Sequence, residues 1–249
     1  MRNLKIILAY DGSDFHGWQV QPGLKTVQGT LGDAIARLTG SGVLPQGSGR
    51  TDAGVHALAQ VASCALDTGI PTSNLQKALN DVLPAAVRVL SVEEVAPEFH
   101  ARKSAKAKTY RYRMLRSPIC PPFLARYVCH HPYPLNEDAM RSAAAVVVGE
   151  HDFTSFAAVD PERGSEQEVS NVRTIYSSEW RREGEELVYT VRGNGFLHHM
   201  VRNLVGTLLM IGKGTLDLPG LRRILDLRDR SAAGQTAPAA GLYLVAVEY

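Results

Sequence analysis

Cysteine is scarce in this chain of 249 residues. Its three cysteines, Cys64, Cys120 and Cys129, are odd in number, and no two of them have CxxC spacing. This pattern argues against a disulfide framework and against a zinc site, and it is typical of a reducing compartment. We therefore expect a cytoplasmic protein without a metal ion.

Long apolar runs are also lacking. Hydrophobic residues make up 45% of the chain, yet no run is long enough to span a bilayer. The first apolar run stops at Tyr10 and Asp11, so it predicts a first β-strand rather than a signal peptide. We therefore expect no membrane partner. The length of the chain is compatible with one large domain or two small domains.

An excess of charge of one sign is missing overall but present locally. The net charge is only +2, so composition alone does not indicate a nucleic-acid-binding protein. Between residues 102 and 116, however, seven basic residues occur without one acid: Arg102, Lys103, Lys106, Lys108, Arg111, Arg113 and Arg116. Interleaved with Tyr110 and Tyr112, they suit a polyanion whose bases stack. The alternative is a solvated strand face.

The first hundred residues predict strand, helix, strand, helix, strand. Strands are expected at residues 5–10, 55–66 and 87–95, and an apolar helical stripe from Val27 ends at Gly40. Ser73 and Gln76 have the spacing of a capping box that opens the second helix, which Pro84 stops.

The second half predicts a similar mixture of elements. Strands are expected at residues 109–115, 172–180, 187–191 and 242–249, the middle two joined by a polar turn. Asn136 is the expected N-cap of a helix that Gly149 ends, the apolar stripe from Phe196 to Ile211 predicts another, and residues 219–227 a short one. Residues 161–169 are expected to be a linker.

This order of elements favours an α+β fold built from two similar subdomains. We expect antiparallel or mixed sheets that join into one continuous sheet, with a central basic cleft as the ligand site. The predicted N-terminal domain is residues 1–105 and the predicted C-terminal domain residues 106–249.

The most informative segment is Gly49-Arg50-Thr51-Asp52-Ala53-Gly54-Val55-His56-Ala57. Glycines beside an acid are typical of a sharp turn or of close approach by a ligand. If the segment is extended, Arg50 and Asp52 lie on one side, and a nearby cation keeps a carboxylate ionised. The alternative is a β-turn with a surface ion pair.

A glycine-rich segment and two histidine pairs do not predict a function. Gly47-Ser48-Gly49 lacks the lysine of a phosphate-binding P-loop, which argues against a phosphate-loop enzyme acting on a small molecule. The pairs His130-His131 and His198-His199 are adjacent rather than one helical turn apart, so neither pair predicts a metal site.

Several segments together resemble the TruA family of tRNA pseudouridine synthases. Besides the segment around Asp52, the resemblance rests on motifs that follow one another from the first strand to the last. They are Leu8-Ala9-Tyr10-Asp11-Gly12, Gly17-Trp18-Gln19, Thr26-Val27-Gln28-Gly29, Lys108-Thr109-Tyr110-Arg111-Tyr112, Asp152-Phe153-Thr154-Ser155-Phe156, Phe196-Leu197-His198-His199-Met200-Val201-Arg202-Asn203 and Gly241-Leu242-Tyr243-Leu244.

The resemblance implies an isomerase that converts uridine to pseudouridine at U38, U39 and U40 of the tRNA anticodon stem-loop. It implies no cofactor or metal, and a homodimer whose contacts come from the C-terminal domain. Asp52 matches the catalytic aspartate, Tyr110 the tyrosine that stacks on uracil, and Arg50 the partner of Asp52 that holds open the gap left by the extruded nucleotide. Arg202 is a supporting candidate that contacts Asp52 or RNA, or else an ordinary helix cation. The alternative function is a non-catalytic RNA-binding or tRNA chaperone protein on the same scaffold.

Overall fold

The computed structural model describes residues 1–159 and 170–249, so the linker predicted at 161–169 lies outside the described residues. Its contacts divide the chain into two compact units, Met1–Lys108 with Tyr243–Tyr249, and Thr109–Leu242. The first unit thus takes in the last strand, which the sequence placed in the second domain. In the described part of the chain, no helix combines the length and the apolar character that crossing a membrane requires.

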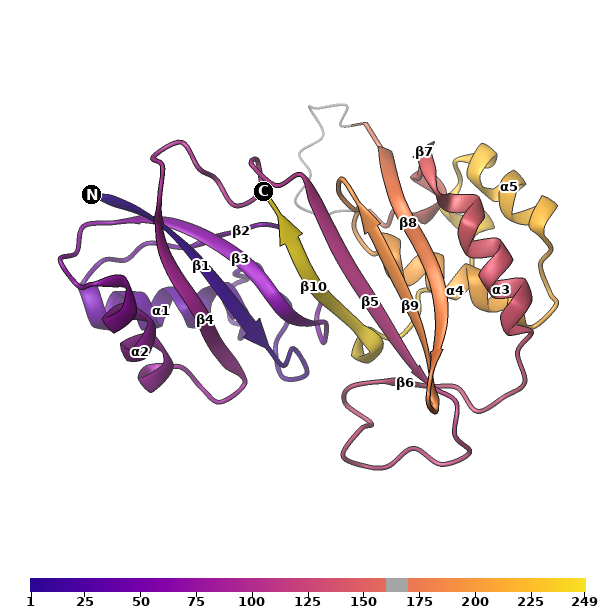
Figure 1. Ribbon diagram of the computed structural model, residues 1–249, viewed down its shortest axis with the longest axis horizontal. Coiled ribbons are helices and arrows are strands. Elements are labelled where there is room, and N and C mark those ends of the chain that lie inside the picture. The colour runs from indigo at the N-terminus through magenta and orange to yellow at the C-terminus, as the bar shows by residue number, and fades with distance from the viewer. Residues whose placement is uncertain (160–169) are drawn as a thin grey trace. The chain divides into compact units, whose positions relative to one another are not determined.

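The first unit contains a mixed sheet (Figure 1). Strand β1 (Arg2–Tyr10) pairs antiparallel with β3 (His56–Leu66) on one side and with β4 (Val87–Val95) on the other. The short β2 (Gln46–Gly47) is antiparallel to β3, whereas β10 (Leu242–Glu248) is parallel to it. This parallel pairing is what joins the end of the chain to the first unit.

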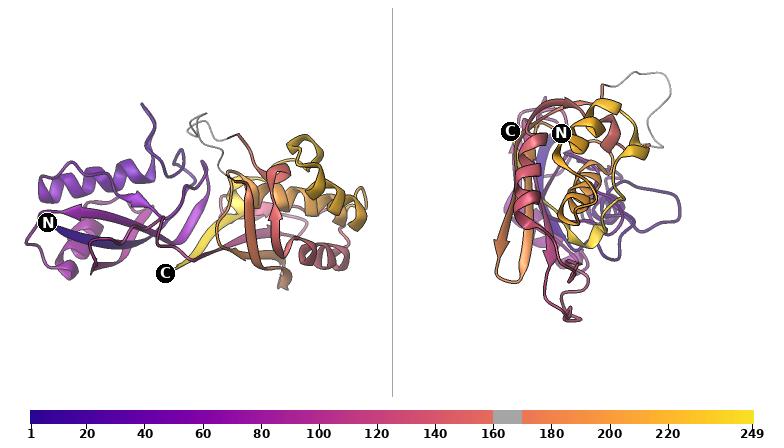
Figure 2. Two further views of the ribbon diagram at one scale, coloured as in Figure 1. Left: turned by 90° about the horizontal axis from the view of Figure 1, so that it is seen from above. Right: turned by 90° about the vertical axis from the view of Figure 1, so that its right-hand side faces the viewer.

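Helix α1 (Val27–Thr39) lies along one face of these strands (Figure 2). Thr26 caps its start by accepting a hydrogen bond from the amide of Gly29, and Gly40 ends it with a φ of 71°. A left-handed residue after the last turn is what glycine tolerates best, so the predicted stop at Gly40 is confirmed.

Helix α2 (Thr72–Val82) corrects one prediction. The capping box of Ser73 and Gln76 is wrong, because the helix begins one residue before Ser73 and its N-cap, Pro71, makes no side-chain hydrogen bond. Gln76 instead donates from Nε2 to the main-chain oxygen of Leu90 at 2.6 Å. The side chain of Gln76 therefore ties α2 to β4.

The second unit also contains a mixed sheet, in the order β5 (Ala107–Leu115), β9 (Glu186–Gly193), β8 (Val172–Glu183), β7 (Gly149–Asp152). Strands β7, β8 and β9 are antiparallel, and β6 (Cys129–His130) runs parallel to β5. The predicted hairpin between residues 172 and 191 is confirmed. With helices and a mixed sheet in each unit, the α+β class is confirmed as well.

The described part of the second unit also contains the helices α3 (Glu137–Ala144), α4 (Met200–Gly212) and α5 (Leu218–Leu227). The predicted cap of α3 is confirmed, since Asn136 accepts from the amide of Ala139. Helix α3 packs on both β8 and α4. Among the described residues, single 3-10 turns occur at Ala145–Val147, Thr154–Phe156, Arg230–Ala232 and Ala239–Gly241.

Two predicted helix limits in this unit were wrong. Helix α3 passes into a 3-10 turn at Ala145 instead of continuing to Gly149, which has a φ of 107° and opens β7. Helix α4 begins at Met200 instead of Phe196, because His199 adopts a φ of 59°. A left-handed residue cannot continue a right-handed helix, so Phe196 lies in the segment that leads into α4.

Candidate active site

Asp52 lies in the connection between β2 and β3, at the first position of a β-turn. The amide of Val55 donates to the main-chain oxygen of Asp52 at 3.1 Å, and Gly54 has a φ of 78°. A left-handed φ within the turn requires the glycine at this position. Asp52 is half-buried and Arg50 is exposed. The acid is therefore presented on a short turn directly before a buried strand.

Buried hydrogen bonds from Gln60 hold the residues that precede this turn. Gln60 is 0% exposed; its Nε2 donates to the main-chain oxygen of Gly49 at 2.9 Å, and its Oε1 accepts from the hydroxyl of Ser48 at 2.7 Å. The amide of Ser48 in turn donates to the main-chain oxygen of Val61 at 2.7 Å. Because these polar groups are shielded from water, each bond that is lost leaves an unsatisfied group.

Tyr10 and Thr51 continue this hydrogen-bonded cluster from β1. Their hydroxyl groups lie 2.8 Å apart, and both side chains are buried. Burial raises the pKa of Tyr10 to about 12, although its hydrogen bonds with Thr51 and Gln60 oppose the shift. The phenol is therefore neutral at physiological pH, and the residue next to Asp52 is anchored to the core of the sheet.

The loop that follows β1 packs on the Asp52 turn without room for side chains. A Cβ atom on Gly12 would lie 2.0 Å from the main-chain oxygen of Val55, and one on Gly17 would lie 2.6 Å from that of Thr51. The amide of Trp18 donates to the same oxygen of Thr51 at 3.0 Å. Close backbone contact of this kind explains why both positions are glycine.

His56 secures the other end of the turn. Its Nδ1 accepts a hydrogen bond from the amide of Gly12 at 3.1 Å and lies 3.3 Å from a carboxylate oxygen of Asp11. Its ring stacks on Tyr243 of β10, with 4.7 Å between centroids. The histidine is thus part of the framework around Asp52.

Lys108 provides a further support for the segment before the acid. Its ammonium group donates to the main-chain oxygen of Ser48 at 2.6 Å. One of the seven basic residues of the segment 102–116 therefore holds the polypeptide that carries Arg50 and Asp52. Sequence patterns gave no sign of this role for Lys108, or of the roles of Gln60 and Thr51.

Tyr110 lies on β5, in the second unit. Its side chain is 7% exposed and makes an edge-to-face contact with Phe196, with 5.1 Å between ring centroids. Phe196 belongs to the segment that leads into α4, so two of the motifs that carried the family resemblance meet here. This packing sets the plane of the Tyr110 ring.

Tyr112 cannot serve as the second stacking platform that the sequence suggested. It is 0% exposed, and its hydroxyl donates to the main-chain oxygen of Pro238 at 2.9 Å. Burial raises the pKa of Tyr112 far above its usual value. A Cβ atom on Gly241 would lie 2.8 Å from its ring. Tyr112 is therefore a core residue of the second unit.

Arg202 lies on α4, as the sequence predicted. Its Nε donates to the main-chain oxygen of Ala237 at 2.7 Å, and the amide of Ala237 donates to the main-chain oxygen of Arg202 at 3.1 Å. The residue thus fixes the segment around residue 237 to α4, within the second unit. Arg50 and Asp52 belong to the first unit, and Tyr110 and Arg202 to the second.

Three arginines of the basic segment form ion pairs with carboxylates from distant parts of the chain. Arg111 donates from Nη2 to both carboxylate oxygens of Glu183, at 2.6 and 2.7 Å. Arg113 binds Glu186 through Nε at 2.8 Å and Nη2 at 2.5 Å, a bidentate pair. The β8–β9 hairpin thus supplies two acids that the basic segment itself lacks.

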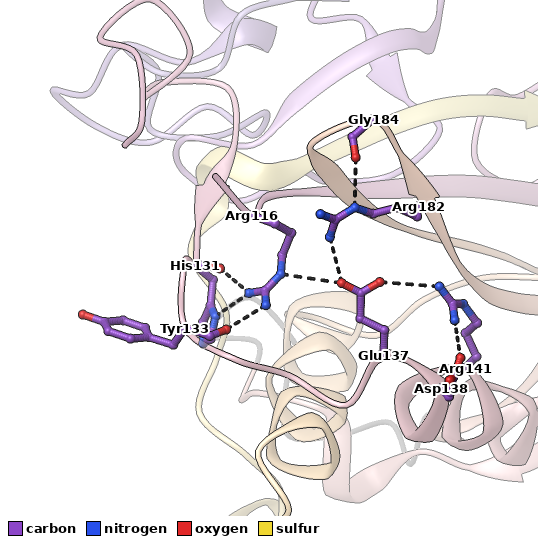
Figure 3. Close-up of polar contacts among 8 residues, drawn as sticks. All are labelled: Arg116, His131, Tyr133, Glu137, Asp138, Arg141, Arg182 and Gly184. Atoms are coloured by element: carbon purple, nitrogen blue, oxygen red, sulfur yellow. Dashed lines mark hydrogen bonds and ion pairs between the residues drawn. The ribbon is translucent and has the colours of Figure 1, made fainter. Parts of the chain in front are cut away.

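Arg116 is the third of these arginines (Figure 3). It donates from Nη2 to the main-chain oxygen of Tyr133 at 2.7 Å, and its Nε lies 3.8 Å from Glu137. Burial and the charge of Arg116 lower the pKa of His131, whose neutral ring accepts from Nη1 at 2.9 Å. Glu137 also receives Arg182 at 2.8 Å. Arg116 therefore forms its hydrogen bonds and its ion pair with residues of the second unit.

Metal ligands do not cluster inside either unit. Among the residues described within one unit, no three histidine, cysteine, aspartate or glutamate side chains bring their ligand atoms together as a single metal ion would require. The chemistry available around Asp52 within its unit is that of a carboxylate, a guanidinium and the hydrogen-bonded backbone.

Comparisons with known proteins agree on one class. A family model described as tRNA pseudouridine synthase matches residues 6–102 and 143–249. The tRNA pseudouridine synthases A of Solibacter usitatus and Brevibacillus brevis are 54% and 45% identical to this chain, and each alignment covers 100% of both proteins. A chain of a solved Cbf5-Nop10-Gar1 complex aligns over 96% of this chain and 57% of its own length, with 12% sequence identity and a TM-score of 0.35. We base no conclusion on this structural match.

These sequence matches define an RNA-modifying class, the tRNA pseudouridine synthases. Within that class, the chain belongs to the TruA family.

Replacing Gln60 by leucine tests the buried hydrogen bonds. Gln60→Leu keeps most of the side-chain volume but removes the partner of the Gly49 main-chain oxygen and of the Ser48 hydroxyl, so we expect the free energy of unfolding to fall by about 1–3 kcal/mol. Amide hydrogen exchange of Ser48 should accelerate as well. Gln76→Leu is the matched control, because Gln76 also donates to a main-chain oxygen. Unchanged Ser48 exchange in Gln60→Leu would contradict this role.

Replacing Gly12 by alanine tests the close backbone contact. The new Cβ must displace the main chain of Val55, and we expect a loss of about 1–3 kcal/mol in unfolding free energy, as for other overpacked sites. Gly69→Ala is the control, since a Cβ there has no neighbour within 4 Å. Thermal unfolding of the two variants compares them directly. Equal melting temperatures would mean that the turn tolerates displacement.

Proposed function

We propose that this chain isomerises uridine to pseudouridine in tRNA, with Asp52 as the catalytic carboxylate. The observation that carries the proposal is the placement of Asp52. It occupies a turn that is held on both sides by buried hydrogen bonds, in a chain that matches tRNA pseudouridine synthases A along its whole length. A carboxylate whose position is set before the substrate arrives needs little reorganisation during the reaction.

The isomerisation breaks one bond and makes another within a single nucleotide. The N1–C1′ bond breaks, the uracil turns, and C5 becomes bonded to C1′. The proton on C5 then leaves and N1 gains a proton, so atoms and electrons balance without a co-substrate. An ionised aspartate at position 52 serves this chemistry by attack on C1′, by addition to C6, or by acting on the ribose.

The other site residues are proposed to handle the extruded nucleotide. A uridine inside a helix must leave the stack, at a cost of a few kcal/mol. Arg50 is exposed and two residues from Asp52, so its guanidinium suits both pairing with the carboxylate and filling the gap. Tyr110 offers a ring for stacking, worth about 1–3 kcal/mol per base, and a hydroxyl for removal of the C5 proton. Arg202 is proposed as a supporting contact to Asp52 or RNA.

The substrate and assembly follow from the family resemblance. We propose that U38, U39 and U40 of the anticodon stem-loop are the targets, that the enzyme is a cytoplasmic homodimer, and that one tRNA contacts both subunits. A continuous sheet with a central basic cleft is part of this proposal. Recognition of the shape of the RNA, with few base contacts, would allow neighbouring uridines to be modified.

Asp52→Asn tests the catalytic carboxylate. The amide keeps the shape of the side chain but cannot act as an anionic nucleophile, so we expect pseudouridine formation to fall on the order of 10⁴-fold. Tritium release from tRNA labelled at C5 of uridine measures the reaction, and filter binding should show that tRNA affinity persists. Asp67→Asn, an exposed acid elsewhere in the first unit, is the control. Normal tritium release by Asp52→Asn would rule out the assignment.

Tyr110→Phe separates the ring from the hydroxyl. Stacking on uracil and the edge-to-face contact with Phe196 should survive, so we expect unchanged tRNA affinity. If the hydroxyl takes part in removing the C5 proton, tritium release should fall at least about 10²-fold. Tyr112→Phe is the control, because its hydroxyl bonds to the main-chain oxygen of Pro238 and to the thiol of Cys129, both in the second unit. A wild-type rate in Tyr110→Phe would limit Tyr110 to stacking.

A further inference from the structure

The first unit contains a cavity of about 460 Å³ beside the segment that carries Asp52. Its volume is in the range of ligand sites, roughly 300–1,000 Å³. The lining comes from three parts of the unit, the loop after β1, the segment from β2 to Arg50, and the turn that follows β4. These residues are Trp18, Gln19, Gln46, Gly47, Gly49, Arg50, His100, Arg102 and Lys103.

The charges on the wall are all of one sign. Arg50, Arg102 and Lys103 are exposed cations, and none of the lining residues is an acid. The indole of Trp18 is buried and packs against Gly47, since a Cβ there would lie 2.5 Å from that ring. A concave site with several cations and no carboxylate attracts an anion.

His100 presents a hydrogen-bond donor in the same wall. Its Nδ1 accepts from the amides of Arg102 at 3.1 Å and Lys103 at 3.4 Å. Since Nδ1 is an acceptor, the proton of the neutral ring is on Nε2. Nε2–H is therefore the atom through which His100 can donate to a bound anion.

The turn that carries these side chains is fixed to β1, to β3 and to Tyr249, the residue after β10. Ala101 is 0% exposed; its amide donates to the hydroxyl of Ser63 on β3 at 3.0 Å, and its main-chain oxygen accepts from the hydroxyl of Tyr249 at 2.9 Å. The side-chain Nδ2 of Asn3 on β1 donates to the main-chain oxygen of Phe99 at 2.9 Å. The backbone under Arg102 and Lys103 is therefore in place before a ligand binds.

Six of the seven basic residues of the segment thus fall into two groups with different roles. Lys108 holds Ser48, and Arg111, Arg113 and Arg116 form ion pairs within the second unit. Arg102 and Lys103, at the start of the segment, line the cavity instead. Only this first part combines cationic side chains with a concave site next to the residues that precede Asp52.

We infer that the cavity binds a backbone phosphate of the substrate RNA close to the target uridine. This inference rests on the proposed function, because it takes tRNA as the ligand. Arg102, Lys103 and the Nε2–H of His100 hold the phosphate, while Arg50 links the cavity to the Asp52 turn. The phosphate fixes the register of the RNA strand, since phosphate contacts position nucleic acid and carry no sequence information.

The test compares two double variants that each remove two positive charges. In Arg102→Gln/Lys103→Gln the cavity loses its cations; in Arg111→Gln/Arg113→Gln the cations lost are those paired with Glu183 and Glu186. Affinity for a tRNA transcript is measured between 50 and 200 mM KCl. Each phosphate contact adds about 0.7–0.9 to the slope of log K against log salt. We expect the first variant to lose about one unit of slope or more and the second to stay near the wild type.

A neutral phosphate analogue locates the contact on the RNA. Single methylphosphonates are placed at each position flanking the modified uridine of an anticodon stem-loop. At one position, the methylphosphonate should weaken binding to the wild-type protein but not to Arg102→Gln/Lys103→Gln. The two changes are then non-additive, as expected when the altered groups are in direct contact. Arg102 and Lys103 are exposed, so folding should be unaffected, and thermal unfolding checks this.

Two failures would be distinguishable. If the wild-type protein releases C5 tritium from tRNA but the two double variants have equal salt slopes and no methylphosphonate position is non-additive, the phosphate site is overturned and the enzyme activity stands. If the wild-type protein releases no tritium from tRNA, the proposed function itself fails, and the phosphate site fails with it.

Discussion

The architecture of the candidate site depends on one buried constraint, the hydrogen bonding of Gln60 to the segment before the Asp52 turn. A single glutamine in β3 satisfies both Ser48 and the main-chain oxygen of Gly49, while Thr51 is bonded to Tyr10. These contacts connect the acid to the interior of a sheet. In a buried setting, such a network is stable only when all its members are paired, which makes the geometry of the segment specific.

Close backbone packing gives the Asp52 turn a second support, from the loop after β1. The Asp52 turn approaches the loop after β1 so closely that Gly12 and Gly17 have no space for a Cβ. Two contacts thus position the backbone that carries the acid: the hydrogen bonds of Gln60 to the preceding residues, and the packing of the loop after β1 on the turn. The backbone that carries Asp52 is fixed in this way, and Asp52 itself is half-buried.

Sequence periodicity was sufficient for most elements. The apolar stripe that opens at Val27 and the alternation in residues 109–115 both predicted elements that the structure contains, because each pattern reports a face buried against a core. Helix starts were less predictable. Helix α4 begins only at Met200 because His199 has a left-handed φ, and no local sequence pattern predicts a left-handed conformation at a histidine.

Contacts between distant parts of the chain account for what the sequence did not reveal. Gln60 looked like any polar residue in a strand, since its partners are 11 and 12 residues away. The basic segment looked uncompensated because Glu183 and Glu186 lie about seventy residues further along. The roles of Asp52, Arg50, Tyr110 and Arg202 came from family resemblance, and their assignment stays a prediction.

The most direct test of the account is the reaction of the wild-type protein with tRNA transcripts that carry tritium at C5 of uridine. The account predicts release of tritium, with pseudouridine found in the anticodon stem-loop at positions 38 to 40. Tight binding of tRNA without any tritium release would contradict it, because a correctly held Asp52 would then not be catalytic.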